Sequence, residues 1–314
     1  MIKMFKVVII LPGWYGRCDF IVREITTLTI MVVAAEHIRT LNKYEKTILL
    51  ALERGMKRYA WVPLEQIRTA TKLSESEVNY RLSRLIAWGM VRFNPVPYDG
   101  YALVFGGYDT LALATLSRNG TITALGPLIG EGKESVVYEA LGLGPVAIKF
   151  HRVGGRSFAS ARLNREYMEE GHCPWLIASR KSAEREFLAL TKLHPHVSVP
   201  LPIGQNRHTV VMALIHGTIL NRCRLECPRE VLDEILDGVR RVYRAGVIHA
   251  DLSEYNILVE DGRCVFIDWP QWVETTHPNA AVIVARDIDN ILSFFVRKYQ
   301  LTYDRRDAIQ CVTG

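Results

Sequence analysis

The sequence predicts an α+β fold in two domains, a small helical domain followed by a larger mixed one. Three observations predict it. Apolar residues recur at helical spacing through 41–98, apolar runs of strand length follow at 146–150 (VAIKF) and 210–215 (VVMALI), and helical spacing returns at 228–242. The chain has 314 residues, of which 49% are hydrophobic and 23% charged. This length and composition indicate a soluble globular protein of about two domains.

The first 40 residues are assigned to neither domain and are treated as an N-terminal extension. Their apolar run at 7–11 is too short to cross a membrane and weak as a signal peptide, so we expect no membrane partner. Met31 is an alternative start, which would make residues 1–30 an upstream extension. Only Cys223 and Cys227 are closely spaced among the six cysteines, and no second pair completes a zinc tetrahedron. We therefore expect no zinc and a reducing, cytoplasmic location.

Residues 41–108 are predicted to form a winged helix-turn-helix domain. We expect a helix over 44–54, a second that opens at Val62 and Pro63 and runs to 70, and a third that begins at Ser74. Ser74 and Glu77 have the spacing of a capping box. Gly89 ends the third helix, and strand-like runs follow at 90–94 and 101–105. Helix, helix, turn, helix and a two-stranded ribbon is the element order of a winged helix.

This domain carries most of the positive charge of the chain. Residues 41–98 contain ten Lys or Arg and five Asp or Glu, a net charge of +5, and the whole chain is +6. The excess favours nucleic-acid contact by the third helix and the wing. The alternative is a protein-docking or dimerisation module with solvated arginines. The residues expected on phosphates are Lys72, Arg81, Arg84 and Arg92.

A helical linker over 109–120 is expected to join this domain to the second, at 121–314. The second domain opens with a glycine-rich stretch that follows the pattern G-x-G-x-x-G-x-V, with a serine at the third glycine. In this pattern the backbone of a hairpin lies over nucleotide phosphates. The stretch comprises Gly130, Glu131, Gly132, Lys133, Glu134, Ser135 and Val137.

A lysine in the next strand run, Lys149 of VAIKF, stands where such a domain contacts the α and β phosphates. A lysine in this role needs a carboxylate to orient it. The helical run SAEREFLALTKL supplies two candidates, of which Glu186 is favoured and Glu184 is the alternative. For either glutamate, a solvated helix face is the simpler interpretation.

The stretch from His249 to Asp268 carries the residue types that phosphoryl transfer needs. Asp251 would orient the nucleophile, and Asn256 and Asp268 would hold Mg²⁺ against the phosphates. Apolar runs at 257–259 and 264–267 flank a D-G turn, which predicts a β-hairpin. Because a hairpin brings its ends together, Asn256 and Asp268 are expected within reach of one ion. Taken alone, the stretch would also suit an ordinary surface hairpin.

Together, GEGKES, KFHRVGGRSF, HADLSEYN and IDWPQ resemble the motifs of the RIO-type atypical protein kinases. They are most similar to archaeal-like members of the second subfamily, which carries a winged helix before the kinase domain. The resemblance covers about residues 41–314. It implies a compact, truncated, two-lobed kinase domain, with an N-lobe at 121–215 and a C-lobe at 216–314. The family often has glycine where this chain has Ala250 and phenylalanine where it has Trp269, but neither departure removes a phosphate or metal ligand.

The resemblance also implies the cofactors, which are ATP and Mg²⁺, with Mn²⁺ as an alternative ion. Lys149, Asp251 and Asp268 would be the catalytic residues, and Asp268 would accept a phosphoryl group transiently. The 210–215 strand would lie behind the adenine, with contacts from Met212, Ala213 and Ile215.

The function implied is an ATP-driven kinase or ATPase in maturation of the small ribosomal subunit, with pre-ribosomal RNA and proteins as partners. Only 46 residues follow Asp268 and they contain no A-P-E, so little of the chain is left to bind a peptide. A serine/threonine protein kinase and a small-molecule phosphotransferase remain alternatives. A DNA-binding regulator with an inactive kinase domain would need a broken motif, and all four of its key residues are present, namely Lys149, Asp251, Asn256 and Asp268.

Overall fold

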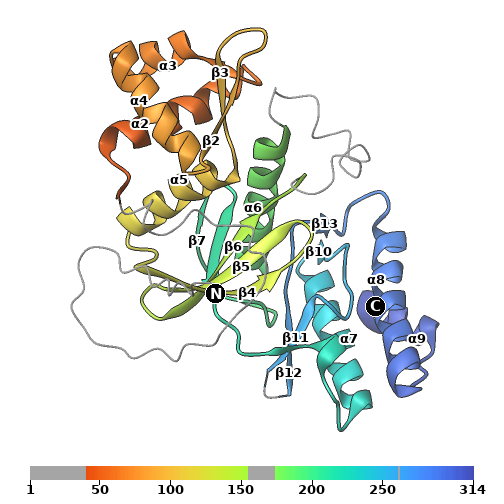
Figure 1. Cartoon of the computed structure of the whole chain (residues 1–314). Helices are drawn as coiled ribbons and strands as arrows, with labels where there is room; N and C mark the ends of the chain where they lie inside the picture. Colours follow the sequence, from red (N-terminus) through yellow and green to blue (C-terminus); the bar gives the residue numbers. More distant parts are fainter. Residues whose placement is uncertain (1–39, 155–173, 261) are drawn as a thin grey trace. The chain divides into compact units, whose positions relative to one another are not determined.

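The computed structural model describes residues 40–154, 174–260 and 262–314. The described residues form two compact units (Figure 1). The first unit runs to Arg180 and includes Asn206–Thr209, and the second comprises Lys181–Gln205 and Val210–Gly314. The predicted N-terminal extension, the alternative start at Met31 and the N-terminal cysteine Cys18 lie outside the described residues. No helix of the described ranges is long and apolar enough to cross a membrane.

The first unit begins with the predicted helices and wing. The helices are α2 (Lys43–Gly55), α3 (Leu64–Thr71) and α4 (Glu75–Ala87), and the strands are β1 (Val62–Pro63), β2 (Val91–Asn94) and β3 (Gly100–Leu103). The strands form one antiparallel sheet in the order β1-β3-β2. The prediction that Val62 and Pro63 open a helix is wrong. They pair with Tyr101 and Gly100 as a short strand, and α3 starts one residue later.

The helix starts differ from the predicted capping. Ser74 accepts a hydrogen bond from the Glu77 amide at 3.3 Å. The Glu77 carboxylate does not complete a capping box there, because it accepts from Arg81 at 2.7 Å. A full capping box instead begins α2, where the Asn42 side chain accepts from the Glu45 amide and Glu45 accepts from the Asn42 amide. The sequence contained this signal, since Asn and Glu three residues apart have the required types.

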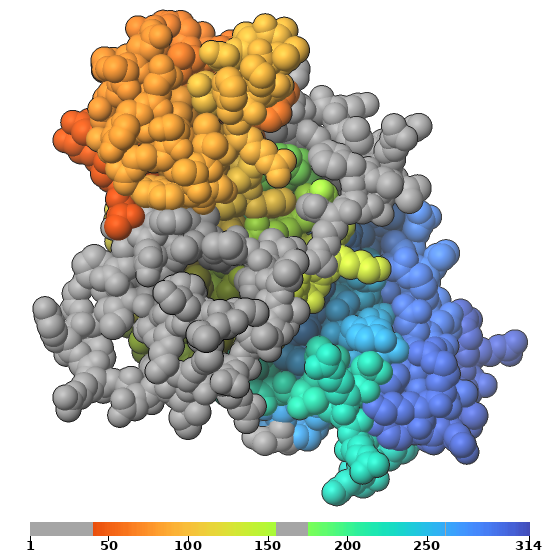
Figure 2. Space-filling model, viewed as in Figure 1, coloured from red at the N-terminus to blue at the C-terminus, as the bar shows by residue number. Residues whose placement is uncertain are grey.

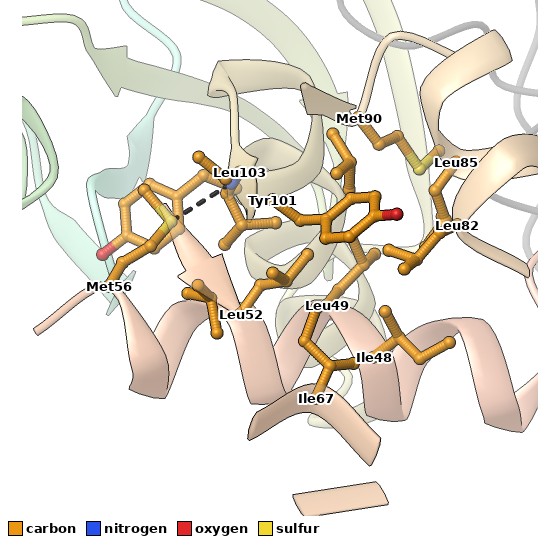
Figure 3. Packing of buried hydrophobic residues seen from close by; sticks show 14 of the residues in the cluster. Ile48, Leu49, Leu52, Met56, Ile67, Leu82, Leu85, Met90, Tyr101 and Leu103 are labelled. Carbon is orange, nitrogen blue, oxygen red and sulfur yellow. Dashed lines mark hydrogen bonds between the residues drawn. The ribbon is translucent and has the colours of Figure 1, made fainter. Parts of the chain in front are cut away.

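The apolar faces of these elements share one core (Figure 3). Its fully buried residues come from α2, α3, α4 and the strands, and the sulfur of Met56 accepts a hydrogen bond from the Leu103 amide at 3.1 Å. The next helix, α5 (Phe105–Arg118), starts before the predicted linker and sends Tyr108 and Leu111 into the same core. A Cβ on Gly107 would lie 2.4 Å from the carbonyl oxygen of Met90, so glycine allows this helix to pack closely. The linker helix is therefore part of the domain.

The rest of the first unit is a three-stranded antiparallel meander. Its strands are β4 (Ala124–Glu131), β5 (Ser135–Leu141) and β6 (Pro145–His151). At the end of β6, the His151 amide donates to the carbonyl of His208 at 2.8 Å. His208 lies in the turn that joins β7 (Pro202–Asn206) to β8 (Thr209–Ala213). Each strand alternates buried and exposed residues or is buried along its length, as expected for strands that pack on one or both faces.

The second unit is mostly helical. Its helices are the C-terminal part of α6 (Pro174–Leu193), η3 (Leu220–Arg222), α7 (Pro228–Arg244), α8 (Ala280–Tyr299) and α9 (Arg305–Thr313). The strands that follow β8 are β9 (Thr218–Ile219), β10 (Val247–Ile248), β11 (Ile257–Glu260), β12 (Arg263–Phe266) and β13 (Val273–Glu274). They form two small sheets, β12-β11-β9 and β10-β13. Helix α8 spans 20 residues and is followed by the shorter α9.

Helix α7 is the centre of this unit. Its buried stripe includes Leu232, Ile235 and Val239. Pro228 stands at its first turn and Gly246 follows its end with a φ of 77°. A Cβ on Gly238 would lie 2.5 Å from the ring of Phe266, so only glycine lets the β11–β12 hairpin pack this closely on α7.

Candidate active site

The predicted site residues divide between the two units. The glycine-rich stretch and Lys149 lie in the first unit. The two candidate glutamates, the predicted adenine-side strand and the β11–β12 hairpin lie in the second.

The glycine-rich stretch is the β4–β5 hairpin, as predicted. Gly130 pairs with Val137 and Glu131 with Val136, and the Gly132 amide donates to the Ser135 carbonyl at 2.9 Å across the turn. Residues 131–134 are exposed, so the backbone of the turn is accessible. The hairpin thus has the form that lies over nucleotide phosphates in the matching motif.

Lys149 lies on β6, the strand next to this hairpin. It pairs directly with Val137, and its side chain is 6% exposed. Directly paired residues project from the same face of a sheet. The antiparallel meander therefore puts the lysine on the same face as the last residue of the glycine-rich motif.

Of the two candidate glutamates on α6, the structure buries one. Glu186 is 1% exposed, and its Oε1 accepts from the Trp269 amide at 3.4 Å, whereas Glu184 is exposed to solvent. Trp269 directly follows Asp268. Glu186 is therefore positioned next to the predicted metal ligand, and its role of orienting Lys149 stays a prediction.

The predicted hairpin forms as β11–β12, with Ile257 opposite Phe266. The Ile267 amide donates to the Asn256 carbonyl at 3.0 Å, which extends the pairing to the residues beside the two predicted ligands. The Asn256 side-chain amide donates to the Asp251 carbonyl at 2.8 Å. The side-chain oxygen of Asn256 therefore points away from the Asp251 carbonyl. Asp268 has a φ of 68°, a left-handed conformation that turns the chain sharply after the hairpin.

Asp251 is the carboxylate that is predicted to orient the nucleophile. Burial raises its pKa, the negative charge of Asp268 raises it further, and the positive charge of Arg286 opposes both. A raised pKa suits a carboxylate that receives a proton. The electrostatic effect of Asp268 also indicates that the two carboxylates are close enough to interact.

The residues before Asp251 are held by groups that the sequence analysis missed. The His249 ring nitrogen Nε2 is 3.0 Å from the Ile267 carbonyl, and its ring lies 4.4 Å from that of Trp269. Ala250 has a φ of 64°, and its amide donates to Asp287 of α8 at 2.7 Å. The Ala250 carbonyl accepts from Arg286. The available signal was the Arg286–Asp287 pair inside a largely apolar helix.

The strand β8 carries the predicted adenine-side residues. Met212 is 8% exposed, so its side chain belongs mainly to the interior. The Ala213 amide donates to the Leu201 carbonyl at 2.9 Å. This leaves the Ala213 carbonyl and the backbone of Leu214 and Ile215 as the groups that could meet a purine.

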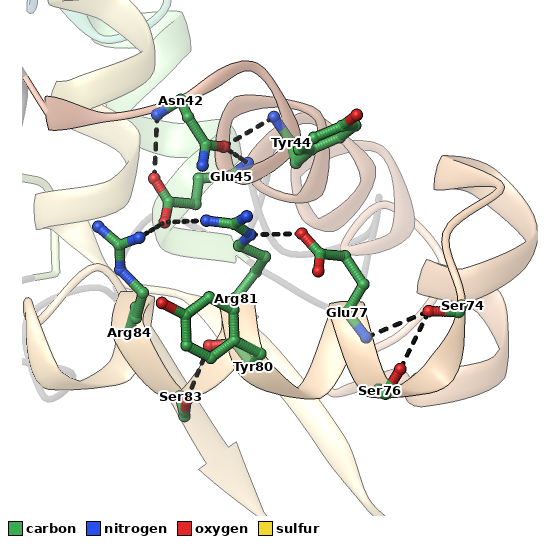
Figure 4. Close-up of polar contacts among 10 residues, drawn as sticks. All are labelled: Asn42, Tyr44, Glu45, Ser74, Ser76, Glu77, Tyr80, Arg81, Ser83 and Arg84. Carbon is green, nitrogen blue, oxygen red and sulfur yellow. Dashed lines mark hydrogen bonds and ion pairs between the residues drawn. The ribbon is translucent and has the colours of Figure 1, made fainter.

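The four predicted nucleic-acid residues fall into two pairs. Lys72 and Arg92 are exposed. Arg84 lies 3.2 Å and Arg81 3.6 Å from the carboxylate of Glu45, which is fully buried (Figure 4). The basic stretch from Phe150 to Lys181 is a further candidate contact for RNA or a partner, and its residues 155–173 lie outside the described ranges.

A family model described as the RIO domain matches residues 136–308, and one described as the N-terminal domain of Rio2 matches residues 38–119. The RIO-type serine/threonine-protein kinase Rio2 of Methanocaldococcus jannaschii is 40% identical over 262 residues, which cover 80% of this chain and 95% of that protein. The serine/threonine-protein kinase rio2 of Schizosaccharomyces pombe is 35% identical over 274 residues, covering 85% and 79%.

A solved structure is also similar over most of its length. It is the Rio2 kinase–ADP/Mg²⁺–phosphoaspartate complex from Chaetomium thermophilum, with a TM-score of 0.76, 29% sequence identity and coverage of 89% of each chain.

Proposed function

The chain belongs to the RIO family of serine/threonine protein kinases, in its Rio2 branch, and from this membership we propose that it is an ATP-driven assembly factor for the small ribosomal subunit. Its partners would be pre-ribosomal RNA and proteins, in the cytoplasm. Its phosphoryl transfer would pass through a transient aspartyl phosphate on Asp268. The phosphoaspartate in the solved Rio2 relative supports this step.

The observation that carries the proposed aspartyl phosphate is the short path from Asp268 to helix α8. Eleven residues, 269–279, join them, and the backbone of this segment is tied to α6. Arg185 donates to the carbonyls of Pro270 and Trp272, and the Trp272 indole donates back to the Arg185 carbonyl at 3.0 Å. A segment this short and this constrained offers little backbone for binding a peptide, which favours an acceptor within the site itself.

The donor atoms fit a magnesium ion. Asn256 offers an amide oxygen and Asp268 a carboxylate, and hard oxygen ligands of this kind suit Mg²⁺ and also Mn²⁺. Bound there, the ion would neutralise charge on the phosphates. Lys149 and the backbone of the glycine-rich hairpin would position the phosphates, and Glu186 would position the chain at Trp269.

In the proposed reaction an oxygen of the Asp268 carboxylate attacks the γ-phosphorus of ATP. A new O–P bond forms, the bond from the γ-phosphorus to the bridging oxygen breaks, and ADP leaves with the electron pair. Water then attacks the phosphorus of the acyl phosphate, which returns Asp268 and releases inorganic phosphate. Asp251 would accept the proton of that water.

The test is to incubate the protein with Mg²⁺ and γ-labelled ATP, denature it, and treat it with hydroxylamine. We expect protein-bound label that hydroxylamine releases, and we expect Asp268→Asn to abolish it. Asp289→Asn removes a carboxylate from the outer part of α8 and serves as the matched control that keeps the label. Label that resists hydroxylamine and maps to serine or threonine would contradict the aspartyl phosphate.

That contrary result would support the second candidate function, phosphoryl transfer to a protein hydroxyl. The raised pKa of Asp251 favours this candidate, because the same carboxylate would accept a proton from serine or threonine.

A further inference from the structure

The acidic side chains of the winged-helix segment are all engaged in ion pairs. Within 41–98 the five glutamates pair with four arginines, three of them in the same segment. The pairs are Glu45 with Arg81 and Arg84, Glu53 with Arg207, Glu65 and Glu75 with Arg68, and Glu77 with Arg81. The net charge of the segment therefore resides on other residues.

Arg81 and Arg84 are needed to neutralise the buried carboxylate of Glu45. Glu45 is fully buried, and the two guanidinium groups are its only cationic partners among the described residues. A buried carboxylate without a positive partner is strongly unfavourable. If either arginine moved to contact a phosphate, the buried Glu45 carboxylate would lose a positive partner and the folded domain would be destabilised. These two residues are therefore poor phosphate ligands.

Seven cations of the segment have no carboxylate partner within the part of the chain that the structure describes. They are Lys43, Lys46, Arg54, Lys57, Arg58, Lys72 and Arg92. Lys72 and Arg92 flank α4 in sequence, since Lys72 lies just before the N-cap of this helix and Arg92 lies on β2 just after it. An excess of unpaired cations favours a polyanionic partner.

Helix α4 itself presents an aromatic ring between the two arginines (Figure 4). The Tyr80 ring is contacted by Arg81 at 4.9 Å and by Arg84 at 5.9 Å, and Arg84 also lies 4.6 Å from the Trp88 ring. Tyr80 is nevertheless 54% exposed. Glu45 fixes the positions of the two guanidinium groups, and these groups contact the Tyr80 ring. The exposed face of Tyr80 is therefore already oriented before any ligand binds.

We propose that the N-terminal domain binds single-stranded RNA on α4, with Tyr80 stacking on a base and with Lys72 and Arg92, not Arg81 and Arg84, contacting phosphates. The choice of RNA rests on the proposed function. A single strand is required because paired bases hide their faces in the stack, whereas an unpaired base can stack on an aromatic side chain. In Figure 2 the helices and the wing form one continuous surface, coloured orange to yellow.

The experiment measures the affinity of the full chain for a fluorescent single-stranded oligouridine by anisotropy at several salt concentrations. Tyr80→Ala is expected to weaken binding by about tenfold without changing the slope of log affinity on log salt, because stacking releases no counterions. Tyr80→Phe should bind like the parent. Lys72→Gln and Arg92→Gln should each make the slope shallower by about 0.7.

The controls separate this site from its surroundings. Tyr98→Ala removes a tyrosine of the wing that is 42% exposed, and it should leave affinity unchanged. Arg84→Gln should lower the thermal unfolding midpoint and leave the salt slope of the folded protein unchanged. A shallower slope for Arg84→Gln, or full affinity for Tyr80→Ala, would overturn the assignment.

Two further outcomes would also overturn it. These are equal affinity for a blunt-ended, fully paired RNA duplex, and no RNA binding by the parent protein. Neither outcome affects the hydroxylamine experiment, so the failure of this inference can be distinguished from the failure of the proposed aspartyl phosphate.

Discussion

At the scale of single residues, the catalytic loop depends on a buried carboxylate in α8. Asp287 is 1% exposed, and burial raises its pKa to about 6 from a usual value of 3.8. The Ala250 amide and the Arg286 guanidinium act in the opposite direction by hydrogen bonding. Because the folded state has the higher pKa, this group contributes stability that is fully present below about 3.8 and is lost as the pH rises through about 6.

Asp287→Asn should remove this pH dependence. The free energy of unfolding of the parent, relative to that of the variant, should fall by up to roughly 3 kcal/mol between pH 4 and pH 7, since one pKa unit corresponds to about 1.4 kcal/mol. Urea unfolding of both proteins at four pH values would measure it. The Asp289 carboxylate is partly exposed and paired with Arg305. For Asp289→Asn, the free energy of unfolding should therefore change with pH in the same way as that of the parent. Parallel curves for Asp287→Asn as well would refute the assignment.

At the scale of elements, α6 and the segment after Asp268 are joined by reciprocal bonds. The Arg185 guanidinium donates through Nε to the Pro270 carbonyl at 2.8 Å and through Nη2 to the Trp272 carbonyl, and its charge lies 5.4 Å from the Trp272 ring. The neighbouring Glu186 accepts from the Trp269 amide. One turn of α6 thus holds the backbone that carries the predicted metal ligand.

Arg185→Lys should weaken the use of Mg²⁺ because lysine keeps the charge but loses the two-pronged contact with the backbone. We expect the Mg²⁺ concentration for half-maximal label formation to rise about tenfold, as is common when a group that orients a metal ligand is changed. Lys192→Gln is the matched control, since its ammonium lies 5.8 Å from the same ring. Equal Mg²⁺ requirements for the parent and Arg185→Lys would show that the contact does not position Asp268.

At the scale of the whole molecule, the winged-helix domain and the three-stranded meander belong to one compact unit, and a buried charge cluster joins them. Asp109 of α5 accepts from Arg152, just after β6, at 2.7 Å and lies 2.7 Å from the His208 ring nitrogen Nε2. His208 stacks on Tyr108 at 4.4 Å, and burial lowers the pKa of His208. Three segments distant in sequence therefore meet at one carboxylate.

Asp109→Asn should destabilise this unit by about 3–5 kcal/mol, because it leaves the buried Arg152 without its counter-charge. Hydrogen exchange followed by mass spectrometry should show loss of protection in α5, β6 and the His208 turn together. The double variant Asp109→Asn with Arg152→Gln should recover part of the loss, since both charges are then absent. Loss of protection in α5 alone would mean that the cluster does not couple these segments.

Much of the fold followed from local signals in the sequence. The helix ends at Gly89 and Gly246 and the tight turn at Gly262 all have positive φ, as the glycines predict. The D-G hairpin brings the neighbours of Asn256 and Asp268 into register, and the motifs of the second domain predict the RIO family that the comparisons show. Each of these features depends on residues close together in the chain, which is why the sequence by itself determines them.

Only the tertiary structure decided which partners the charged residues take. Val62 and Pro63 became a strand because Tyr101 and Gly100, far along the chain, offer a pairing edge. Arg81 and Arg84 turned inward because a carboxylate from another helix is buried beneath them. Asp287 reached Ala250 across 37 residues, and burial separated Glu186 from Glu184. A pattern in sequence specifies the type and the local geometry of a residue, but burial and charge pairing depend on what the rest of the chain brings to it.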